Sequence, residues 1–303
     1  MKSNKKILFF LLLTEFVMFS CNAKEVKANP ITDFYFEANK TFTEITIYRY
    51  DGKSPNVVIP SEIEGIPVTE INSFSSYMNP TKITSVVIPD TVKKIGKEAF
   101  SQCKELKYVK FSKNLEVIGT LSFFLCEKLE GIILPESLRV IGDNAFAGCK
   151  SLKNIDFKNV EFIGIGAFQE TALYSVTFPQ TLQYIGSRAF YNCNNLEKVI
   201  LPEKFSVIYI DETNRPKEHH LNEVFSGNKI NSSIALQKQL TQTKLKTGSR
   251  ENLENVSKKY NIYHSCPINS PNSQKATIRF CLAKFLAGIF RKSLRTIFSN
   301  PCA

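Results

Sequence analysis

The chain has 303 residues, of which 39 are Lys or Arg and 28 are Asp or Glu, and its formal net charge is +11. With 43% hydrophobic and 22% charged residues, the composition is that of a globular protein and not of a disordered or collagen-like chain. The absence of Trp and the presence of only three His leave little room for histidine-based metal binding or catalysis. The longest uninterrupted apolar run, residues 7–13, is far shorter than the roughly 20 residues of a membrane-spanning helix, which argues against a multi-pass membrane protein.

The positive charge is concentrated in the last quarter of the chain. Residues 228–303 contain thirteen Lys or Arg and two Asp or Glu, so their net charge of +11 equals the excess of the whole chain. The middle of the chain is almost neutral. We therefore predict no nucleic-acid partner, although a basic protein can suggest one.

The first 20 residues have the pattern of a secretory signal peptide. Lys2, Lys5 and Lys6 precede the short apolar run, and a small residue, Ser20, ends the segment. We expect an exported protein whose signal peptide covers residues 1–20.

A cysteine follows the predicted signal peptide directly. The order Ser20-Cys21 resembles a bacterial lipobox, in which the cysteine becomes the lipidated first residue of the mature protein. We therefore expect lipidation at Cys21, a polar tether over 21–40, and a membrane-anchored lipoprotein at the outer membrane or cell surface. The alternative is an ordinary cleaved signal with a coincidental cysteine.

The middle of the chain is an internal repeat with a period of about 23 residues. A glycine recurs in five units, as Gly96, Gly119, Gly142, Gly164 and Gly186. A phenylalanine follows four residues later in each unit, as Phe100, Phe123, Phe146, Phe168 and Phe190. Such a period, with apolar triplets like Leu-x-x-Val-x-Phe, is typical of a leucine-rich solenoid. The predicted fold class is an α/β repeat: a solenoid with one short strand per coil and short helical or 3₁₀ turns on the convex side.

Two positions of the repeat have an expected physical role. Each phenylalanine should contribute to an apolar spine that runs through the stack, because one coil cannot bury its apolar face alone. Each glycine should open a turn, with a positive φ angle.

The repeats resemble the BspA-like leucine-rich repeat family of bacterial surface proteins. The matching phrases are residues 87–100 and 134–149, and residues 47–71 look like the capping unit of that family. The resemblance implies an N-terminal capping region over 41–85, followed by a solenoid with its C-terminal cap over 86–228.

Four cysteines lie three residues after a repeat phenylalanine, at Cys103, Cys126, Cys149 and Cys193, with Thr171 in their place in the remaining unit. Disulfides between neighbouring coils are conceivable, because adjacent strands lie about 4.8 Å apart. We favour buried, inert thiols, since Thr171 replaces one of them in register. No metal site is predicted, because close cysteine pairs are missing and His219-His220 are expected to stand in an inserted loop. No cofactor and no enzymatic activity are predicted, since no catalytic or nucleotide-binding motif is present.

The outward positions of the predicted strands form the candidate binding face. Its members are Lys107, Tyr108, Lys110, Ile133, Lys153, Asp156, Tyr174, Thr177 and Lys198. Exposed tyrosines often anchor protein interfaces, so Tyr108 and Tyr174 are the strongest candidates. The alternative is an ordinary solvated sheet face, which every solenoid has.

The C-terminal quarter does not follow the repeat. Residues 229–275 are rich in polar side chains and are predicted to be a linker. Residues 276–303 are predicted to be a basic amphipathic tail, in which one helical face is formed by Leu282, Phe285, Leu286, Ile289, Phe290, Leu294 and Ile297. The tail could contact a membrane or an acidic partner, pack on the open end of the solenoid, or be an incidental extension.

The family resemblance implies a function in binding. We expect a cell-surface lipoprotein that acts as an adhesin towards host or extracellular-matrix proteins, other bacterial surface proteins or other cells. The alternative is a periplasm-facing envelope scaffold whose basic tail contacts a membrane or another envelope protein.

Overall fold

The structure is a computed structural model, and it describes residues 27–74, 82–202 and 224–228. By its contacts the chain divides into two compact units, residues 1–209 with 218–248 and residues 210–217 with 249–303. All described residues belong to the first unit. Within these ranges there is no helix with the length and apolar character required to cross a membrane.

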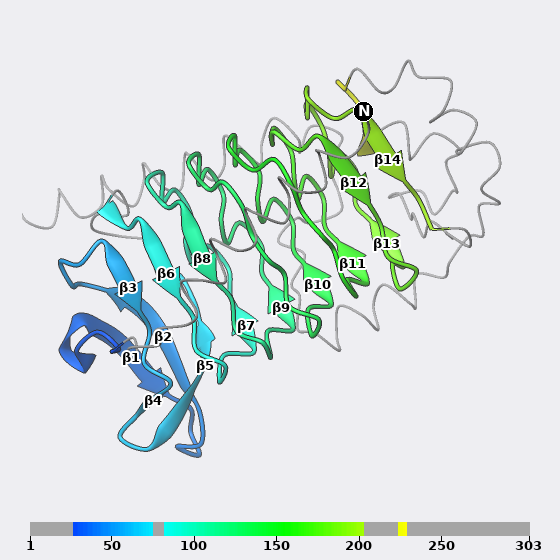
Figure 1. The fold of residues 1–303 in the computed structure, drawn as a ribbon. Coiled ribbons are helices and arrows are strands. Elements are labelled where there is room, and N and C mark those ends of the chain that lie inside the picture. The colour runs from blue at the N-terminus through cyan, green and yellow to red at the C-terminus, as the bar shows by residue number, and fades with distance from the viewer. Residues whose placement is uncertain (1–26, 75–81, 203–223, 229–303) are drawn as a thin grey trace, which may run out of the picture. The chain divides into compact units, whose positions relative to one another are not determined.

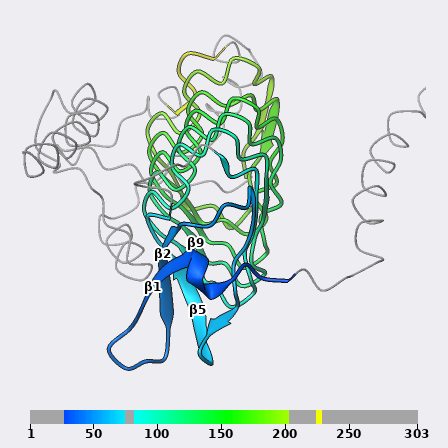
Figure 2. The ribbon, with the colours of Figure 1, turned by 90° about the vertical axis from the view of Figure 1, so that its left-hand side faces the viewer.

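Each coil contributes short strands to two parallel ladders (Figure 1). The first ladder consists of β3 (Asn56–Val58), β6 (Ser85–Val87), β8 (Tyr108–Lys110), bridges at Gly131 and Asn154, and then β12 (Ser175–Thr177) and β14 (Lys198–Ile200). The second ladder consists of β5 (Ile66–Ile71), β7 (Lys94–Ile95), β9 (Val117–Ile118), β10 (Val140–Ile141), β11 (Phe162–Ile163) and β13 (Tyr184–Ile185). Equivalent residues of successive coils are paired, for example Ile95 with Ile118. Figure 2, viewed from the end of the stack near β1 and β2, shows the coils one behind another.

The predicted leucine-rich solenoid is confirmed, and two details differ from the prediction. Each coil has a second strand position where one strand was expected, because residues such as Val117-Ile118 also pair between coils. The segment around each spine phenylalanine is a run of turns and not a helix. Its N–H groups bond to the next coil, as Phe100 N donates to Ser122 O at 2.6 Å.

Left-handed residues explain why these turns do not become helices. In each of the five coils from Phe100 to Phe190, a residue two before and a residue two after the spine phenylalanine has a positive φ angle, as in Glu98 (56°) and Gln102 (61°) around Phe100. A right-handed helix cannot continue through such residues, because its hydrogen-bond pattern requires negative φ throughout.

An N-terminal cap precedes the coils. A short 3₁₀ turn, η1 (Ile31–Asp33), leads into the antiparallel pair β1 (Phe34–Ala38) and β2 (Ile45–Tyr50), and β2 then pairs in parallel with β5. A hairpin joins β4 (Glu62–Ile63) to β5 through Glu64 and Gly65, which both have positive φ, as a tight two-residue turn requires.

The cap begins before the predicted boundary at residue 41. β1 lies within the range 21–40 that the sequence predicted to be a tether, and its first residue is buried. The ring of Phe34 lies 5.3 Å from Tyr50 and 6.3 Å from Phe74. This apolar contact draws the segment onto the first coil.

The predicted phenylalanine spine is confirmed. From Phe100 to Phe190 each ring lies 5.1–5.3 Å from the next. Two further rings extend it, because Phe74 lies 5.1 Å from Phe100 and Phe225 lies 5.5 Å from Phe190. The sequence analysis missed both. Phe74 follows an Asn in place of the repeat glycine, and Phe225 stands 23 positions after Pro202, whereas Phe190 stands 11 after Pro179.

The repeat glycines have a role other than the predicted one. None of the five has a positive φ. Instead, the coils approach each other so closely that a Cβ on Gly142 would lie 2.7 Å from the backbone C of Gly119 and N of Thr120. A Cβ on Gly186 would lie 2.4 Å from the backbone N of Ile165. The glycine is thus required by the contact between coils and not by a turn.

Removing one spine ring should destabilise the whole stack. Phe146 is fully buried, with Phe123 and Phe168 stacked on either side, and a buried Phe→Ala change costs about 3–5 kcal/mol. Phe146→Ala should therefore lower the melting temperature markedly in calorimetry. Lys110→Ala, which removes an exposed side chain, should barely change it, and equal effects of the two would contradict this register.

Adding one methyl group between coils should also destabilise the protein. In Gly142→Ala the new Cβ meets backbone atoms that cannot move aside, and such overpacking costs about 1–3 kcal/mol. Gly131→Ala is the matched control, because a Cβ there has no neighbour within 4 Å. Urea unfolding should show a loss of stability for the first variant alone. A loss of equal size in both would rule out the close-contact explanation.

Candidate binding surface

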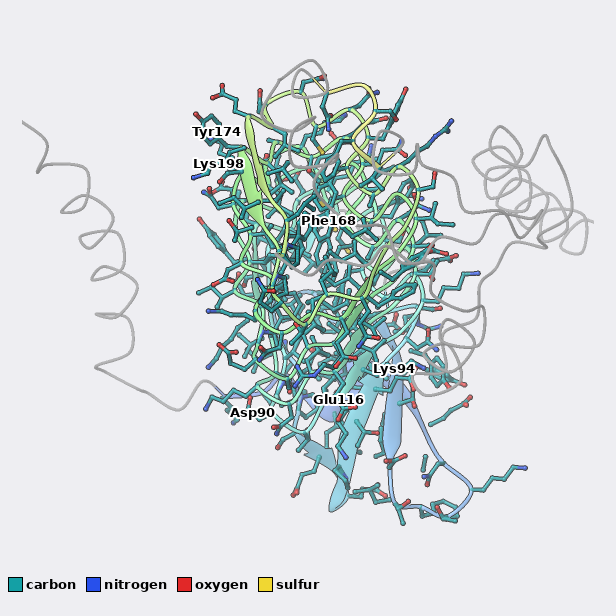
Figure 3. All side chains as sticks on the ribbon, turned by 90° about the vertical axis from the view of Figure 1, so that its right-hand side faces the viewer. Asp90, Lys94, Glu116, Phe168, Tyr174 and Lys198 are labelled. Atoms are coloured by element: carbon teal, nitrogen blue, oxygen red, sulfur yellow. The ribbon has the colours of Figure 1, made fainter. Side chains whose placement is uncertain are left out.

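The outward side of the first ladder forms one exposed surface, which we call the strand face. The inward residues of the first ladder, including Val86, Val109 and Val176, are part of the core. All nine predicted binding residues lie on the exposed side: Lys107, Tyr108, Lys110, Ile133, Lys153, Asp156, Tyr174, Thr177 and Lys198. Figure 3 shows Tyr174 and Lys198 at the outer edge and Phe168 inside the coil.

The pairing between coils arranges these residues in columns. Tyr108 pairs with Ser85 and with Gly131, and Gly131 in turn pairs with Asn154. Tyr174 belongs to the neighbouring column, since its N–H donates to Lys153 O at 3.1 Å and its own carbonyl accepts from Glu197 N at 2.9 Å. The two tyrosines therefore stand in different columns, three coils apart.

Apolar and aromatic side chains are unusually exposed on this face. Tyr108 and Tyr174 are each 53% exposed, and Ile133 is 69% exposed. Ile200, which is not among the nine predicted binding residues, continues the column of Ile133 at the C-terminal end and is 36% exposed. The alternation of inward and outward residues along the strand, which identified Ile133, also marks Ile200 as an outward residue.

The charges of the strand face are mostly positive. Lys107, Lys110, Lys153 and Lys198 make no ion pair among the described residues, whereas Asp156 is bound by Lys158 Nζ at 2.9 Å. The hydrogen bond from Lys158 lowers the pKa of Asp156 and keeps it ionised. The four ammonium groups thus remain available to a partner.

A shallow open hollow surrounds Tyr174. It is lined by Lys153, Ala172, Tyr174, Asn194, Asn195 and Glu197. The Tyr174 hydroxyl donates to Glu197 Oε2 at 2.5 Å, and this hydrogen bond together with the negative charge raises the pKa of the phenol. The bond holds the ring in place, so the hollow has one fixed aromatic wall. The sequence reasoning missed Asn194 and Asn195, which lie in the turn of the next coil.

The comparison with protein families identifies the repeat. The family described as BspA type Leucine rich repeat region matches residues 69–197 and 161–293, in six copies. The chain belongs to this BspA-type family.

The comparison with solved structures also finds leucine-rich repeat proteins. A T. pallidum leucine-rich repeat protein, TpLRR, is 30% identical over 67% of this chain and 98% of its own, with a TM-score of 0.54. A leucine-rich cell surface protein of Faecalibacterium prausnitzii is 26% identical over 57% of this chain and 54% of its own, with a TM-score of 0.43. No curated protein matched the sequence.

The cysteines of the BspA-type coils are buried thiols. Cys126 Sγ donates to Phe100 O at 3.2 Å and Cys149 Sγ donates to Phe123 O at 3.3 Å, so each thiol ties its coil to the preceding one. Thr171 fills the same position and donates to Phe168 O at 2.9 Å. Burial raises the pKa of Cys126, Cys149 and Cys193, which keeps these thiols protonated and unreactive, in agreement with the favoured prediction.

Several predicted features lie outside the described residues: Cys21, the pair His219-His220, and the tail 276–303. Within the described ranges there is no group of three or more His, Cys, Asp or Glu side chains that could hold a metal ion.

The buried thiols should resist alkylation in the folded protein. Because burial raises the pKa of Cys149, the thiolate should be scarce at mildly alkaline pH, and the coil should also exclude the reagent. Peptide mass spectrometry after iodoacetamide treatment should find Cys149 modified only once the coils are unfolded by denaturant. An exposed Lys110→Cys variant is the control for reagent access. Modification of both residues at the same rate in folded protein would contradict the assignment.

Proposed function

We propose that this chain is a cell-surface protein-binding module that uses its strand face as an adhesin. The observation that carries the proposal is the exposure of Tyr108, Tyr174 and Ile133 on one face. The same face presents four lysines that form no ion pair with any residue that the structure describes. Binding rather than catalysis is what such a surface supports, because aromatic anchors supply contact area and charged groups supply orientation.

The repeat makes this face suitable for a large protein partner. The residues are carried by backbone that is hydrogen-bonded to the coil on each side, for example Ile88 N to Lys110 O at 2.9 Å. A surface that is already ordered loses little conformational entropy when a partner binds. The columns run along the stack from β6 to β14, which suits an extended or broad protein surface better than a small molecule.

The charge of the face favours an acidic partner. Lys107, Lys110, Lys153 and Lys198 are exposed, and two of the acidic neighbours are already engaged, Asp156 by Lys158 and Glu197 by Tyr174. Attraction between exposed charges is screened by salt. Capture of a partner by this face should therefore weaken as ionic strength rises.

Attachment to the cell surface is part of the same proposal. It rests on the signal-like sequence 1–20, on Cys21 and on the BspA-type family, whose resemblance implies bacterial surface proteins. With a lipid on Cys21, the strand face would be held at the membrane by the segment before β1.

The strand face can be tested with a double substitution. Tyr108→Ala with Tyr174→Ala should weaken capture of matrix or host-cell proteins by the immobilised mature chain, because one interface anchor is worth about 2 kcal/mol, roughly thirtyfold in affinity. The melting temperature should change little, since both rings lie outside the core.

The matched control replaces two exposed aromatic residues that lie off the strand face. Tyr35 and Phe42 are 51% and 71% exposed, so Tyr35→Ala with Phe42→Ala removes a similar area from the cap. This control should leave capture unchanged, as should deletion of residues 276–303. The face hypothesis is wrong if deletion of the tail abolishes capture and the double tyrosine variant retains it.

The anchor is tested by Cys21→Ser. The variant should move from the membrane to the soluble fraction and should no longer incorporate labelled palmitate. A protease applied to intact cells should remove the wild-type protein from the surface. Survival until lysis would instead indicate the periplasm-facing scaffold.

A further inference from the structure

One turn of the fourth coil is shorter than its equivalents in the other coils. Two residues separate the repeat cysteine from the next leucine in four of the five coils, as Asn194 and Asn195 do before Leu196. In the fourth coil a single residue, Ala172, stands there. The longer turn is closed by a hydrogen bond from the leucine N–H to the cysteine carbonyl, as Leu196 N donates to Cys193 O at 2.9 Å. Because such a bond spans four residues, the shorter segment cannot form it.

The open hollow on the strand face lies at this shorter turn. Ala172 lines the hollow, together with Lys153 of the preceding coil and Asn194 and Asn195 of the following coil. A methyl side chain on a shortened turn leaves space that the longer turns on either side do not fill. The volume of the hollow is about 320 Å³, at the lower end of the range of about 300–1,000 Å³ for ligand pockets. The missing residue thus accounts for a hollow of ligand size.

The polar groups around the hollow match hydroxyl groups. Asn194 and Asn195 are exposed, and their side-chain amides form no hydrogen bond with any residue that the structure describes. An amide side chain both donates and accepts, as a hydroxyl group does. Lys153 adds an ammonium donor, and Glu197 adds Oε1, since the hydroxyl of Tyr174 is bonded to Oε2 alone. One positive and one negative group leave the lining without net charge, which favours a neutral polyhydroxylated ligand over a phosphate or a carboxylate.

The ring of Tyr174 provides a flat wall for such a ligand. The side chain is 53% exposed and stands at the outer edge of the strand face (Figure 3). The face of an aromatic ring is electronegative, and the C–H groups on one face of a pyranose carry a partial positive charge, so the two attract each other. The hydrogen bond to Glu197 already fixes the ring, and little side-chain entropy is lost when a ligand stacks on it.

We propose that this hollow binds one neutral pyranose unit of a glycan, stacked on Tyr174 and hydrogen-bonded by Asn194 and Asn195. The site does not depend on the adhesin proposal, because a free oligosaccharide would bind to it in the same way. Where the strand face captures a glycoprotein, the hollow would add recognition of the attached sugar.

A glycan array probed with the full mature chain tests the ligand class. The chain should bind neutral oligosaccharides, and ligand-observed NMR titration should then give the affinity for one that binds. Tyr174→Ala should weaken this affinity about tenfold or more, because it removes the stacking wall. Tyr35→Ala is the matched control, since that ring is 51% exposed but lies on the cap, and it should leave the affinity unchanged. Both rings lie outside the core, so both variants should fold.

A second variant fills the hollow and leaves its polar groups in place. Ala172→Gln should abolish sugar binding without lowering the melting temperature, because Ala172 is not part of the core. The proposal is overturned if the wild type binds no neutral oligosaccharide, or if Ala172→Gln binds as well as the wild type. It is also overturned if only sialylated or sulfated glycans bind and Lys153→Ala abolishes their binding, which would make the hollow an anion site.

Capture of proteins from which the glycans have been removed enzymatically separates this inference from the adhesin proposal. Ala172→Gln should retain such capture, since no sugar is then involved. Sugar binding without any capture of stripped proteins would contradict the adhesin proposal alone. Capture of stripped proteins by a chain that binds no sugar would contradict the glycan site alone.

Discussion

Successive coils of this protein touch backbone to backbone at the repeat glycine, and the rest of the structure depends on this contact. At Gly164 a Cβ would lie 2.5 Å from the backbone N of Asp143, a distance that no real side chain accepts. Because the coils meet there without side chains between them, they can also meet at the ladders and at the spine. The rings of Phe146 and Phe168 stand 5.3 Å apart, close to the spacing of adjacent strands.

The same constraint explains why the turns beside the spine are not helices. Their N–H groups face the carbonyl groups of the next coil, as Phe123 N faces Ala145 O at 2.8 Å, and the backbone is satisfied between coils and not within a turn. Left-handed residues such as Leu121 and Leu125 produce the required alternation. The left-handed conformation is unfavourable for these residues, and the hydrogen bonds between coils offset that cost.

In a stack held in this way, the core does not constrain which residue types stand in the outward columns. Every coil repeats the inward residues, while the outward residues are free to differ without disturbing the core. The two ladders differ in how exposed their outward residues are. On the strand face the outward residues are exposed, with Tyr108 and Ile133 among lysines, whereas the outward residues Val117, Val140, Phe162 and Tyr184 of the second ladder are buried.

The sequence alone determined the solenoid, the spine from Phe100 to Phe190 and the exposed positions of the strand face, because these follow from periodicity and alternation. It did not reveal the second strand of each coil, since pairs such as Val140-Ile141 are too short to produce a visible pattern. The role of the repeat glycines, the different columns of Tyr108 and Tyr174, and the burial of the outward residues of the second ladder were decided only by the tertiary structure. These features depend on how neighbouring coils are paired and how closely they approach. A sequence records the order of residues along a coil but neither of those relations.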